Sequence, residues 1–492
     1  MFPKVRNQSI ESWITLAVIC VAITHFCTAA ENSSLRGYHK IMGLPGQPKV
    51  EFQQYAGHIT ISREPQRALF YYFVEAETDA TSKPLVLWLS GGPGCSSVGG
   101  GAFFEHGPFK PSGGGALVKN NYSWNKVANM LYLESPAGVG FSYSKDASFY
   151  EYVNDTNTAQ DNLIFLQNWL DNYPEYKTRD FYVTGESYAG HYVPQLAKLI
   201  VQEGSKFNLK GIAVGNPLLE FETDENSRAL FYWSHGIISD EAYELSSATC
   251  NISQLYREKL TSTNFSGPCR HLFNIIANQT ERIDGYDVTA DVCETSGGSQ
   301  AEIFRNKLMK PRFQLFHSLQ SVYEPLTTQS ESTQTIDPCL SYKILDYLNR
   351  KDVQEALHAQ LVGVAHWNFC SQVLDYDSKN VFIPTIDIVS SLVGSGFRVL
   401  VYSGDQDSVI PFIGSRTLVK GLAKELKLNI TVPYRAWFEE KQVGGWTEAY
   451  GDILRYATIR GGSHLAPYSS PGRSLVLFKA FIAGKPLPDG NV

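Results

Sequence analysis

The sequence predicts an α/β fold with a mostly parallel central sheet, and two observations support this prediction. Short apolar runs that suit buried strands alternate with helix-like stretches, a pattern typical of a parallel sheet covered by helices. One of these runs, at 181–184, passes through a tight turn at 185–190 directly into a helix-like stretch at 193–200, and the turn carries Ser187. Strand, sharp turn and helix around a serine predict a nucleophile elbow, which holds the hydroxyl above the strand ends.

Further strands and helices are expected in a simple order along the chain. Leu163, Leu166, Trp169 and Leu170 recur at helical spacing and predict a helix ahead of the strand at 181–184. The first two strands look antiparallel, and a helix closes the domain at 474–482. The strands themselves are expected at residues 55–62, 68–76, 85–89, 130–134, 181–184, 211–214, 397–402 and 453–459.

The alternation of strands and helices stops after Pro217 and resumes near Val381, which predicts an insertion. We expect this insertion to be a helical and loop cap over the carboxyl ends of the strands, where open α/β sheets bind ligands. Within it, the polar segment 326–335 is expected to be a protease-sensitive loop. The expected division is a signal peptide over 1–30, core over 31–217, cap over 218–370 and core again over 371–492.

A candidate acid and a candidate histidine follow Ser187 in the order that α/β-hydrolases use, which is serine, then acid, then histidine. Asp405 lies just beyond the strand expected at 397–402, and His464 lies just beyond the strand expected at 453–459. Asp407 lies in the same turn as Asp405, but we assign the acid to Asp405. The sequence therefore predicts an α/β-hydrolase fold with Ser187, Asp405 and His464 as catalytic triad.

A second strand end is rich in glycine and can supply the oxyanion hole of an acyl-transfer site. The apolar run 84–89 leads into Ser-Gly-Gly-Pro-Gly-Cys-Ser-Ser from Ser90. Glycines leave backbone N–H groups open to a carbonyl oxygen that gains negative charge. We assign the oxyanion hole to the N–H of Gly92 and the N–H of Tyr188, the residue after the nucleophile. A phosphate-binding loop is disfavoured because no Gly-Lys-Ser/Thr follows.

Five motifs occur in one order along nearly the whole chain. They are W-L-x-G-G-P-G-C-S-S from Trp88, E-S-P-A-G-V-G-F-S-Y from Glu134, G-E-S-Y-A-G from Gly185, S-G-D from Ser403 and S-H from Ser463. Together they resemble the serine carboxypeptidases, and most closely the plant serine carboxypeptidase-like group. The resemblance runs from about residue 44 to residue 488. It implies an α/β-hydrolase that releases C-terminal residues from peptides at acidic pH.

The same resemblance suggests how a free C-terminus is recognised. Glu105 and Glu186 match positions where family members use a carboxyl pair that binds the substrate carboxylate, and Ser90 and Gly91 match the neighbouring loop. Two carboxyl groups held together raise the pKa of one another, so one can stay protonated and donate a hydrogen bond at acidic pH. Ser90 departs from the hydrolytic members, which usually carry Asn there, and a serine hydroxyl is a single donor on a shorter arm.

Two other functions stay open beside the peptidase. Some plant relatives are acyltransferases that use glucose esters, and Ser90 is compatible with that branch. Glu186, Ala189 and the E-S-P-A-G-V motif favour the peptidase branch. The third alternative, a secreted binding protein on an inactive hydrolase scaffold, is disfavoured because Ser187 and its expected partners are all present.

Composition and charge agree with a secreted globular enzyme. The chain has 492 residues, of which 43% are hydrophobic, and a formal net charge of −7, so its length allows a large core. No run of lysine and arginine occurs, which makes nucleic acid an unexpected partner. No H-E-x-x-H or C-x-x-C pattern is present, so we expect no metal and no other cofactor.

The N-terminus predicts export. Lys4 and Arg6 precede an apolar stretch at 13–23 and small residues at 28–30, as in a secretory signal peptide, and this stretch is shorter than the roughly 20 residues that a membrane-spanning helix needs. After its removal we expect no membrane association and a location in the vacuole or outside the cell. Peptide or protein C-termini are the expected partners, and the oligomeric state stays open between monomer and homodimer.

Cysteines and glycosylation sequons support the secretory prediction. Six cysteines remain after the signal peptide, which suggests three disulfides. The residues alone allow 15 pairings, and the family resemblance favours Cys95 with Cys370, Cys250 with Cys269 and Cys293 with Cys339. The sequence Asn-x-Ser/Thr marks seven candidate glycosylation sites, at Asn32, Asn121, Asn154, Asn251, Asn264, Asn278 and Asn429.

Overall fold

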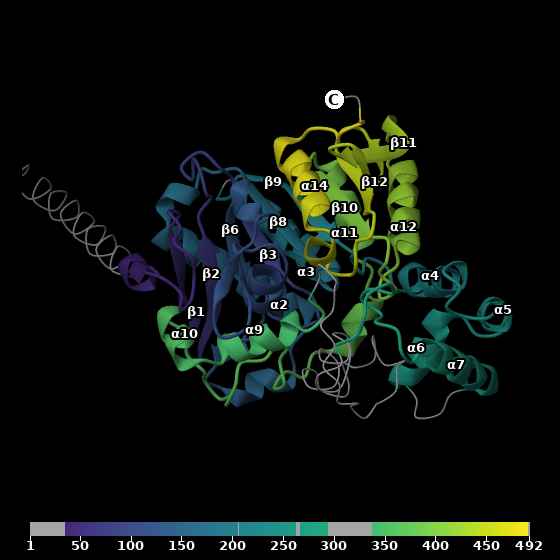
Figure 1. Cartoon of the computed structure of the whole chain (residues 1–492), viewed down its shortest axis with the longest axis horizontal. Coiled ribbons are helices and arrows are strands. Elements are labelled where there is room, and N and C mark those ends of the chain that lie inside the picture. The colour runs from purple at the N-terminus through teal and green to yellow at the C-terminus, as the bar shows by residue number, and fades with distance from the viewer. Residues whose placement is uncertain (1–34, 205, 262–265, 294–336, 491–492) are drawn as a thin grey trace, which may run out of the picture.

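The central feature of the computed structural model is one large, mostly parallel sheet with helices packed around it (Figure 1). The structure describes residues 35–204, 206–261, 266–293 and 337–490. The strands follow the order β1-β2-β6-β3-β8-β9-β10-β13-β12-β11, and the short strand β7 (Tyr143–Ser144) pairs with β2. Their bounds are β1 Gln54–Arg63, β2 Gln66–Val74, β3 Leu85–Leu89, β6 Asn129–Leu133, β8 Phe181–Glu186, β9 Leu209–Gly215, β10 Arg398–Gly404, β11 Ile430–Glu439, β12 Gln442–Tyr450 and β13 Leu454–Ile459.

The inner six strands, from β6 to β13, pair in parallel, and antiparallel pairs stand at both sides of them. Every residue of β3, β6 and β8 is buried, which explains why these strands read as continuous apolar runs in the sequence. The expected positions of these strands are confirmed to within a few residues. Parallel pairing brings the carboxyl ends of β3, β8, β10 and β13 to one edge, so the loops after them meet there.

Helices connect these strands and cover the sheet. Helix α2 (Asp155–Asn172) buries Leu166, Trp169 and Leu170, and the side chain of Asn154 caps it by accepting the N–H of Asn157. Helix α3 (Ala189–Gln202) packs on β8 and β9, and α12 (Phe412–Glu425) packs on β10 and β13. The connection into β10 is α11 (Ile386–Gly394), and the chain closes with α13 (Ala466–Ser469) and α14 (Pro471–Ala483).

The chain between β9 and α11 holds helices only, within the residues that the structure describes. Four of them lie together at one side of the molecule in Figure 1, and they are α4 Phe221–Ser234, α5 Asp240–Ala248, α6 Ile252–Thr261 and α7 Gly267–Thr280. Of the others, α9 (Leu340–Leu348) and α10 (Lys351–Ala356) lie beneath β1 and β2 in that view, and the short helix η7 (Ser378–Phe382) precedes α11. We keep the division at residues 218 and 370 as a proposal.

Helix α9 joins the first half of the core through polar contacts. The Tyr347 hydroxyl donates to the carbonyl of Pro45, and Arg350, just after this helix, donates to the carbonyl of Gly115. Each bond links residues that are more than 200 positions apart in the sequence. The insertion therefore packs on the core at more than one place.

Three disulfides join the described cysteines, in the pairs that the family resemblance implied. They are Cys95–Cys370, Cys250–Cys269 and Cys293–Cys339. The first connects the glycine loop after β3 with the end of the insertion, across 275 positions of sequence. This disulfide therefore fixes the glycine loop to a second, distant part of the chain.

Four of the seven sequon asparagines, Asn121, Asn251, Asn278 and Asn429, are exposed, and Asn154 is half-buried. The other two, Asn32 and Asn264, lie outside the described residues, as do the expected signal peptide and the expected loop at 326–335. No helix in the described part of the chain has the length and apolarity needed to span a bilayer.

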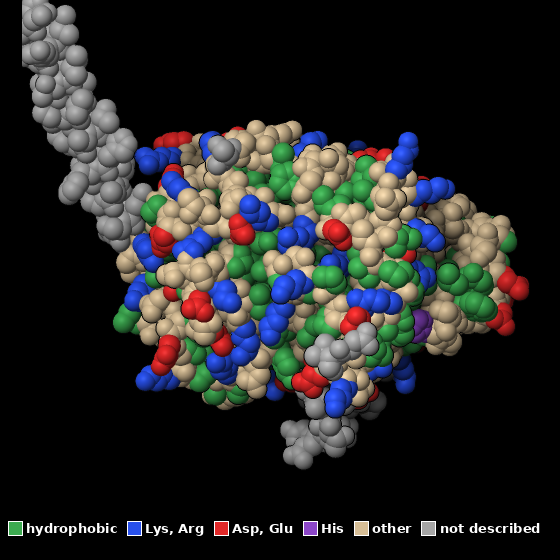
Figure 2. Space-filling view, turned by 90° about the horizontal axis from the view of Figure 1, so that it is seen from above, with side chains coloured by type: hydrophobic (Ala, Val, Ile, Leu, Met, Phe, Trp, Pro, Cys, Tyr) green, Lys and Arg blue, Asp and Glu red, His purple; other side chains and the backbone are tan. Residues whose placement is uncertain are grey.

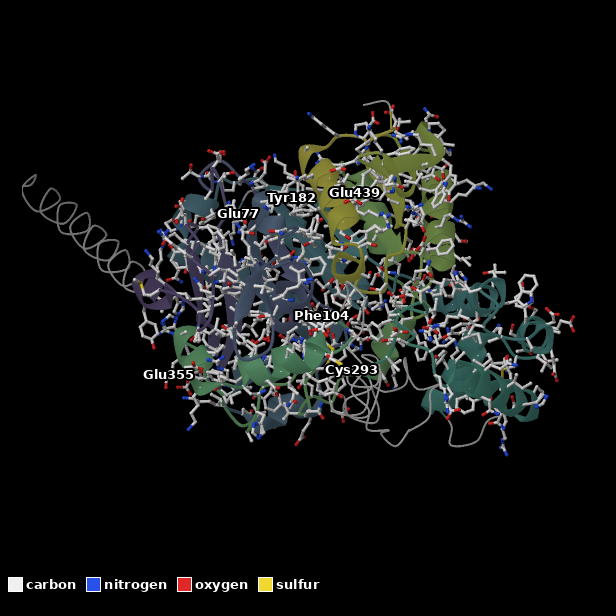
Figure 3. All side chains as sticks on the ribbon, viewed as in Figure 1. Glu77, Phe104, Tyr182, Cys293, Glu355 and Glu439 are labelled. Carbon is white, nitrogen blue, oxygen red and sulfur yellow. A yellow bond between two sulfur atoms is a disulfide. The ribbon has the colours of Figure 1, made fainter. Side chains whose placement is uncertain are left out.

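Basic side chains gather on the face seen from above in Figure 2, among acidic and apolar ones. In Figure 3 Tyr182, near the start of β8, lies toward that upper face, whereas Phe104 lies lower in the molecule. Tyr182 lies near the amino end of β8, and Phe104 is the neighbour of Glu105 in the predicted site. The parallel strands therefore run downward in this view, and their carboxyl ends form the lower edge of the sheet. The basic face is therefore at the opposite end from the predicted site.

Candidate active site

The turn after β8 has the geometry of a nucleophile elbow. Ser187 has a φ of 61°, a conformation that is strained for a residue with a side chain and that is typical of this turn. Its N–H donates to the carbonyl of Gly215 at 2.9 Å, and its own carbonyl accepts the N–H groups of Gly190 and Leu218. Three backbone hydrogen bonds of Ser187 therefore hold this strained conformation.

Small residues around the elbow are required by close backbone approach. A Cβ on Gly185 would lie 2.3 Å from the carbonyl oxygen of Leu89, and a Cβ on Gly91 would lie 2.4 Å from the backbone nitrogen of Tyr188. Both distances are below any van der Waals contact. The glycine loop after β3 and the elbow after β8 are thus pressed against each other, which places both candidate oxyanion donors in one small region.

The acid that contacts the candidate histidine is Asp407, and the prediction of Asp405 is wrong. Asp407 Oδ2 lies 2.8 Å from His464 Nδ1, and both side chains are buried. Asp405 instead accepts the backbone N–H of Gly461 at 2.7 Å and the side-chain amide of Gln406 at 2.9 Å. Asp405 thus ties the loop after β10 to the loop after β13, and only a residue two positions further along contacts His464.

Asp407 is surrounded by donors that hold its carboxylate in place. The side-chain amide of Asn216 donates to Oδ2 at 2.7 Å, and the backbone N–H groups of Val409 and Ile410 donate to Oδ1 and Oδ2. A carboxylate with these partners is oriented as well as desolvated. No local sequence signal separates Asp407 from Asp405, because both lie in the same turn.

A segment of the insertion, residues 284–288, supports His464 and was missed in the sequence. The backbone N–H of His464 donates to the carbonyl of Tyr286 at 2.7 Å, and the Tyr286 ring stands edge-on to the imidazole with centroids 4.7 Å apart. The segment is also tied to the turn of the acid, because Ser408 donates its N–H and its hydroxyl to the carbonyl of Gly285. His464 Nε2 is buried and has no hydrogen-bond partner among the described residues.

The two expected oxyanion donors lie on elements that other contacts hold. Gly92 has a φ of +115°, and the disulfide Cys95–Cys370 follows three residues later in the same loop. The loop is further held where the N–H of Gly94 donates to the Tyr192 hydroxyl at 3.1 Å. In the part of the chain that the structure describes, no acceptor pairs with the N–H of Gly92 or of Tyr188. Both N–H groups are therefore available to a ligand.

Glu105 and Glu186 come together as a buried carboxyl pair. Glu105 ends the buried helical turn η1 (Val98–Glu105), and Glu186 directly precedes the elbow serine. Burial raises the pKa of Glu105 to about 7, against the effects of the neighbouring Glu186 and of the charge of Lys110. Burial and the charge of Glu105 raise the pKa of Glu186 well above its ordinary value. Ionising both of two buried neighbouring carboxyl groups is costly, so the pair keeps a proton at acidic pH.

Lys110 is a cation near this pair that the sequence motifs do not include. Its ammonium group lies 5.3 Å from the centroid of the Tyr468 ring, and burial lowers its pKa to about 8, although the charge of Glu105 acts in the opposite direction. In return the Lys110 charge favours the ionised form of Glu105. The carboxyl pair is therefore tuned by a neighbouring base.

Ser90 is buried beside the glycine loop. Its hydroxyl oxygen accepts the indole N–H of Trp88 at 3.2 Å, and its backbone N–H donates to the Ser97 hydroxyl at 3.0 Å. The hydroxyl proton of Ser90 is consequently free to point at a neighbouring acceptor. Within the described residues no cluster of His, Cys, Asp and Glu has the arrangement of a metal site.

Comparison with known proteins agrees with this geometry. The family model described as serine carboxypeptidase matches residues 45–484. Serine carboxypeptidase-like 45 and serine carboxypeptidase-like 46 of Arabidopsis thaliana are each 53% identical to the chain, over 97% of this chain and 98% of each relative. Among solved structures, Kex1(delta)p, a prohormone-processing carboxypeptidase from Saccharomyces cerevisiae, aligns with a TM-score of 0.69 and 20% identity, over 91% of this chain and 96% of the other. That structural likeness concerns the fold, which is confirmed as α/β-hydrolase.

Proposed function

Because the chain belongs to the serine carboxypeptidase family and is a serine-type hydrolase, we propose that it releases C-terminal residues from peptides at acidic pH. The observation that carries this proposal is the buried hydrogen bond between His464 and Asp407. The elbow is joined to this pair, because Ser187 bonds the carbonyl of Gly215 and the next residue, Asn216, donates to Asp407. A serine, a histidine and an oriented acid in this arrangement are the machinery of acyl transfer.

Each member of this triad has one step in the proposed reaction. Ser187 Oγ attacks the carbonyl carbon of the scissile bond while His464 Nε2 takes its proton. Asp407 accepts the Nδ1–H of His464, which leaves Nε2 as the free basic nitrogen and stabilises the imidazolium that forms. His464 then protonates the leaving amine, and water hydrolyses the acyl-enzyme with His464 as base.

We assign the stabilisation of the negative charge on the carbonyl oxygen to hydrogen bonds from the N–H groups of Gly92 and Tyr188. Both belong to backbone that is fixed before substrate arrives, by the strained elbow and by the bonded loop. Donors that need no rearrangement during the reaction contribute most to the rate.

Recognition of the free C-terminus is assigned to Glu105 and Glu186, with Ser90 and Gly91 beside them. While protonated, the pair donates a hydrogen bond to the substrate carboxylate, and it repels that carboxylate once it ionises. The raised pKa values support an activity that declines above about pH 7. The proposed substrates are peptide or protein C-termini in a secretory compartment, either the vacuole or the cell exterior.

The test is a product assay on the purified full-length chain together with labelling by a serine-reactive organophosphonate. We expect a blocked dipeptide with a free C-terminus to be cleaved at about pH 5, and the label to be found on Ser187. The variant Ser187→Ala should lose both cleavage and label. Absence of labelling in the wild type would overturn the proposed function and favour a binding protein on the same scaffold.

An acyltransferase that uses glucose esters is the second candidate, and Ser90 is the observation that favours it. Ser90→Asn restores a longer amide donor beside the substrate carboxylate. If the enzyme is a peptidase, KM for a peptide acid should fall about tenfold, as expected for a charge-assisted hydrogen bond, with kcat little changed. If the enzyme is an acyltransferase, the variant should lose glucose-ester transfer. Unchanged KM and unchanged transfer would show that Ser90 does not face the substrate.

A further inference from the structure

A buried carboxylate lies beneath the elbow and is used by none of the steps above. Asp155, the first residue of α2, is 4% exposed and accepts four hydrogen bonds. Its Oδ1 accepts the hydroxyl of Tyr188 at 3.0 Å and the hydroxyl of Tyr376 at 2.7 Å. Its Oδ2 accepts from His191 Nδ1 and from Gln195 Nε2, each at 2.9 Å. All four donors converge on one carboxylate.

The negative charge of Asp155 is stabilised where it lies. Burial acts to raise its pKa, but hydrogen bonds and charge from His191 and the surrounding donors hold the pKa below its ordinary value. The amino end of α2 also favours an anion at this position. Burying a charged group is costly unless it is fully paired, so a site of this kind imposes one arrangement on its partners.

Two of these partners lead to the oxyanion hole. Tyr188 supplies one expected donor with its backbone N–H, and its own hydroxyl is anchored on Asp155. Tyr192 accepts the N–H of Gly94, two residues after the second expected donor. Its ring packs against the rings of Tyr188 and Tyr376, with centroids 5.3 and 6.4 Å away, and Asp155 holds the hydroxyls of both. One half of the hole is therefore tied to this carboxylate by a hydrogen bond of Tyr188, and the other half by the packing of Tyr192 on the two tyrosines that Asp155 holds.

We propose that Asp155 is the positioning residue of the oxyanion hole, acting through the tyrosines at 188, 192 and 376. The inference rests on the proposed acyl-enzyme function. Asp155 transfers no proton and touches no substrate; it fixes the backbone that carries the two N–H groups. Because these donors bind the oxyanion more tightly than the ground-state carbonyl, misplacing them should lower kcat and leave KM nearly unchanged.

The test compares Asp155→Asn, Tyr188→Phe and Tyr192→Phe with two matched controls. Asp161→Asn removes another buried charge on the same helix, where Asp161 accepts from Arg67 at 2.9 Å. Tyr173→Phe removes a buried hydroxyl that bonds Tyr71 at 2.8 Å. For each variant, kcat and KM are measured on a peptide acid, together with the inhibition constant of a peptidyl boronate, which forms a tetrahedral adduct.

We expect the three test variants to lower kcat by about 10- to 100-fold and to weaken boronate binding in parallel, with KM changed by no more than about threefold. The controls should keep the wild-type kcat. The double variant Asp155→Asn with Tyr188→Phe should lose less than the product of the two single losses, because both changes break the same contact.

The outcomes separate this inference from the proposed function. If wild-type Ser187 is not labelled by organophosphonate, the proposed function fails and the inference fails with it. If the wild type is labelled and active but Tyr188→Phe and Tyr192→Phe keep its kcat and boronate affinity, the inference alone is overturned. Equal losses in Asp161→Asn would also overturn it, since burial of charge on α2 would then be sufficient. If Asp155→Asn does not fold, the two tyrosine variants decide.

Discussion

Asp407 Oδ2 lies 2.8 Å from His464 Nδ1, whereas Asp405, two residues earlier in the same turn, bonds the N–H of Gly461. Two acids in one turn thus have separate tasks, one holding the imidazole and the other holding the turn that carries it. The distinction has a direct kinetic consequence, because only one of them fixes the tautomer of His464.

Asp407→Asn should therefore lower kcat/KM on a peptide acid by about 10⁴-fold, as expected when the imidazole loses its orienting acid. Asp405→Asn should keep activity within about tenfold, because it affects only the turn. Steady-state kinetics on both variants, with circular dichroism to establish folding, checks this. Full activity of Asp407→Asn together with loss of activity in Asp405→Asn would contradict the observed contact.

The carboxyl pair predicts a pH dependence of substrate binding. Glu105 has a pKa raised to about 7 and Glu186 has a pKa raised well above its ordinary value, so the pair is protonated at acidic pH and begins to gain negative charge as pH rises through about 7. KM for a peptide with a free C-terminus should be flat at low pH and should rise toward tenfold per pH unit above about pH 7. A C-terminally amidated peptide carries no opposing charge and should show a much weaker rise. Superimposable profiles for acid and amide would rule out this role of the pair.

Lys110 should set the upper end of that pH range. Its charge favours ionised Glu105, so Lys110→Gln should raise the pKa of Glu105 further and let the pair keep its proton to higher pH. The KM profile should shift toward alkaline pH, by a fraction of a pH unit. Lys119→Gln is the matched control, since Lys119 is an exposed lysine that pairs with Glu77. A shift in the acidic direction would contradict the inferred electrostatics.

Buried Glu134 predicts that stability falls as pH rises. Its carboxyl group accepts hydrogen bonds from the Ser96 hydroxyl, the Phe141 N–H and the Trp367 indole, yet burial raises its pKa to about 7. Between the ordinary value of 4.5 and about 7 the folded state binds the proton more tightly than the unfolded state does. The stabilisation is therefore complete below about pH 4.5 and is lost toward pH 7, by an amount on the order of 1–3 kcal/mol.

Thermal unfolding at about pH 5 and about pH 7.5 checks this expectation. The midpoint should be lower at the higher pH, and Glu134→Gln should show a smaller difference between the two conditions, whatever its absolute stability. Glu175→Gln, at an exposed ion pair with Arg36, should keep the wild-type difference. An unchanged difference in Glu134→Gln would assign the pH dependence to other groups.

Local patterns in the sequence were sufficient for the framework of this protein. Continuous apolar runs followed by glycine turns marked β3 and β8, because a strand buried on both faces has no polar side and a close backbone approach excludes side chains. The order of Ser187 and His464 along these strands then placed both at one edge of a parallel sheet. These inferences depend on contacts between residues close in sequence or on the topology of the sheet alone.

Only the tertiary structure decided which side chains meet. Asp405 and Asp407 are equivalent as residues in a turn, and the choice between them depends on a curve of the chain that brings one of them over His464, 57 positions away. Tyr286 and Asp155 carried no motif, because their contacts with His464 and Tyr188 span segments that are distant in sequence. Burial of a carboxyl group is likewise a property of all elements around it, so the pKa of Glu105 and the influence of Lys110 follow from packing.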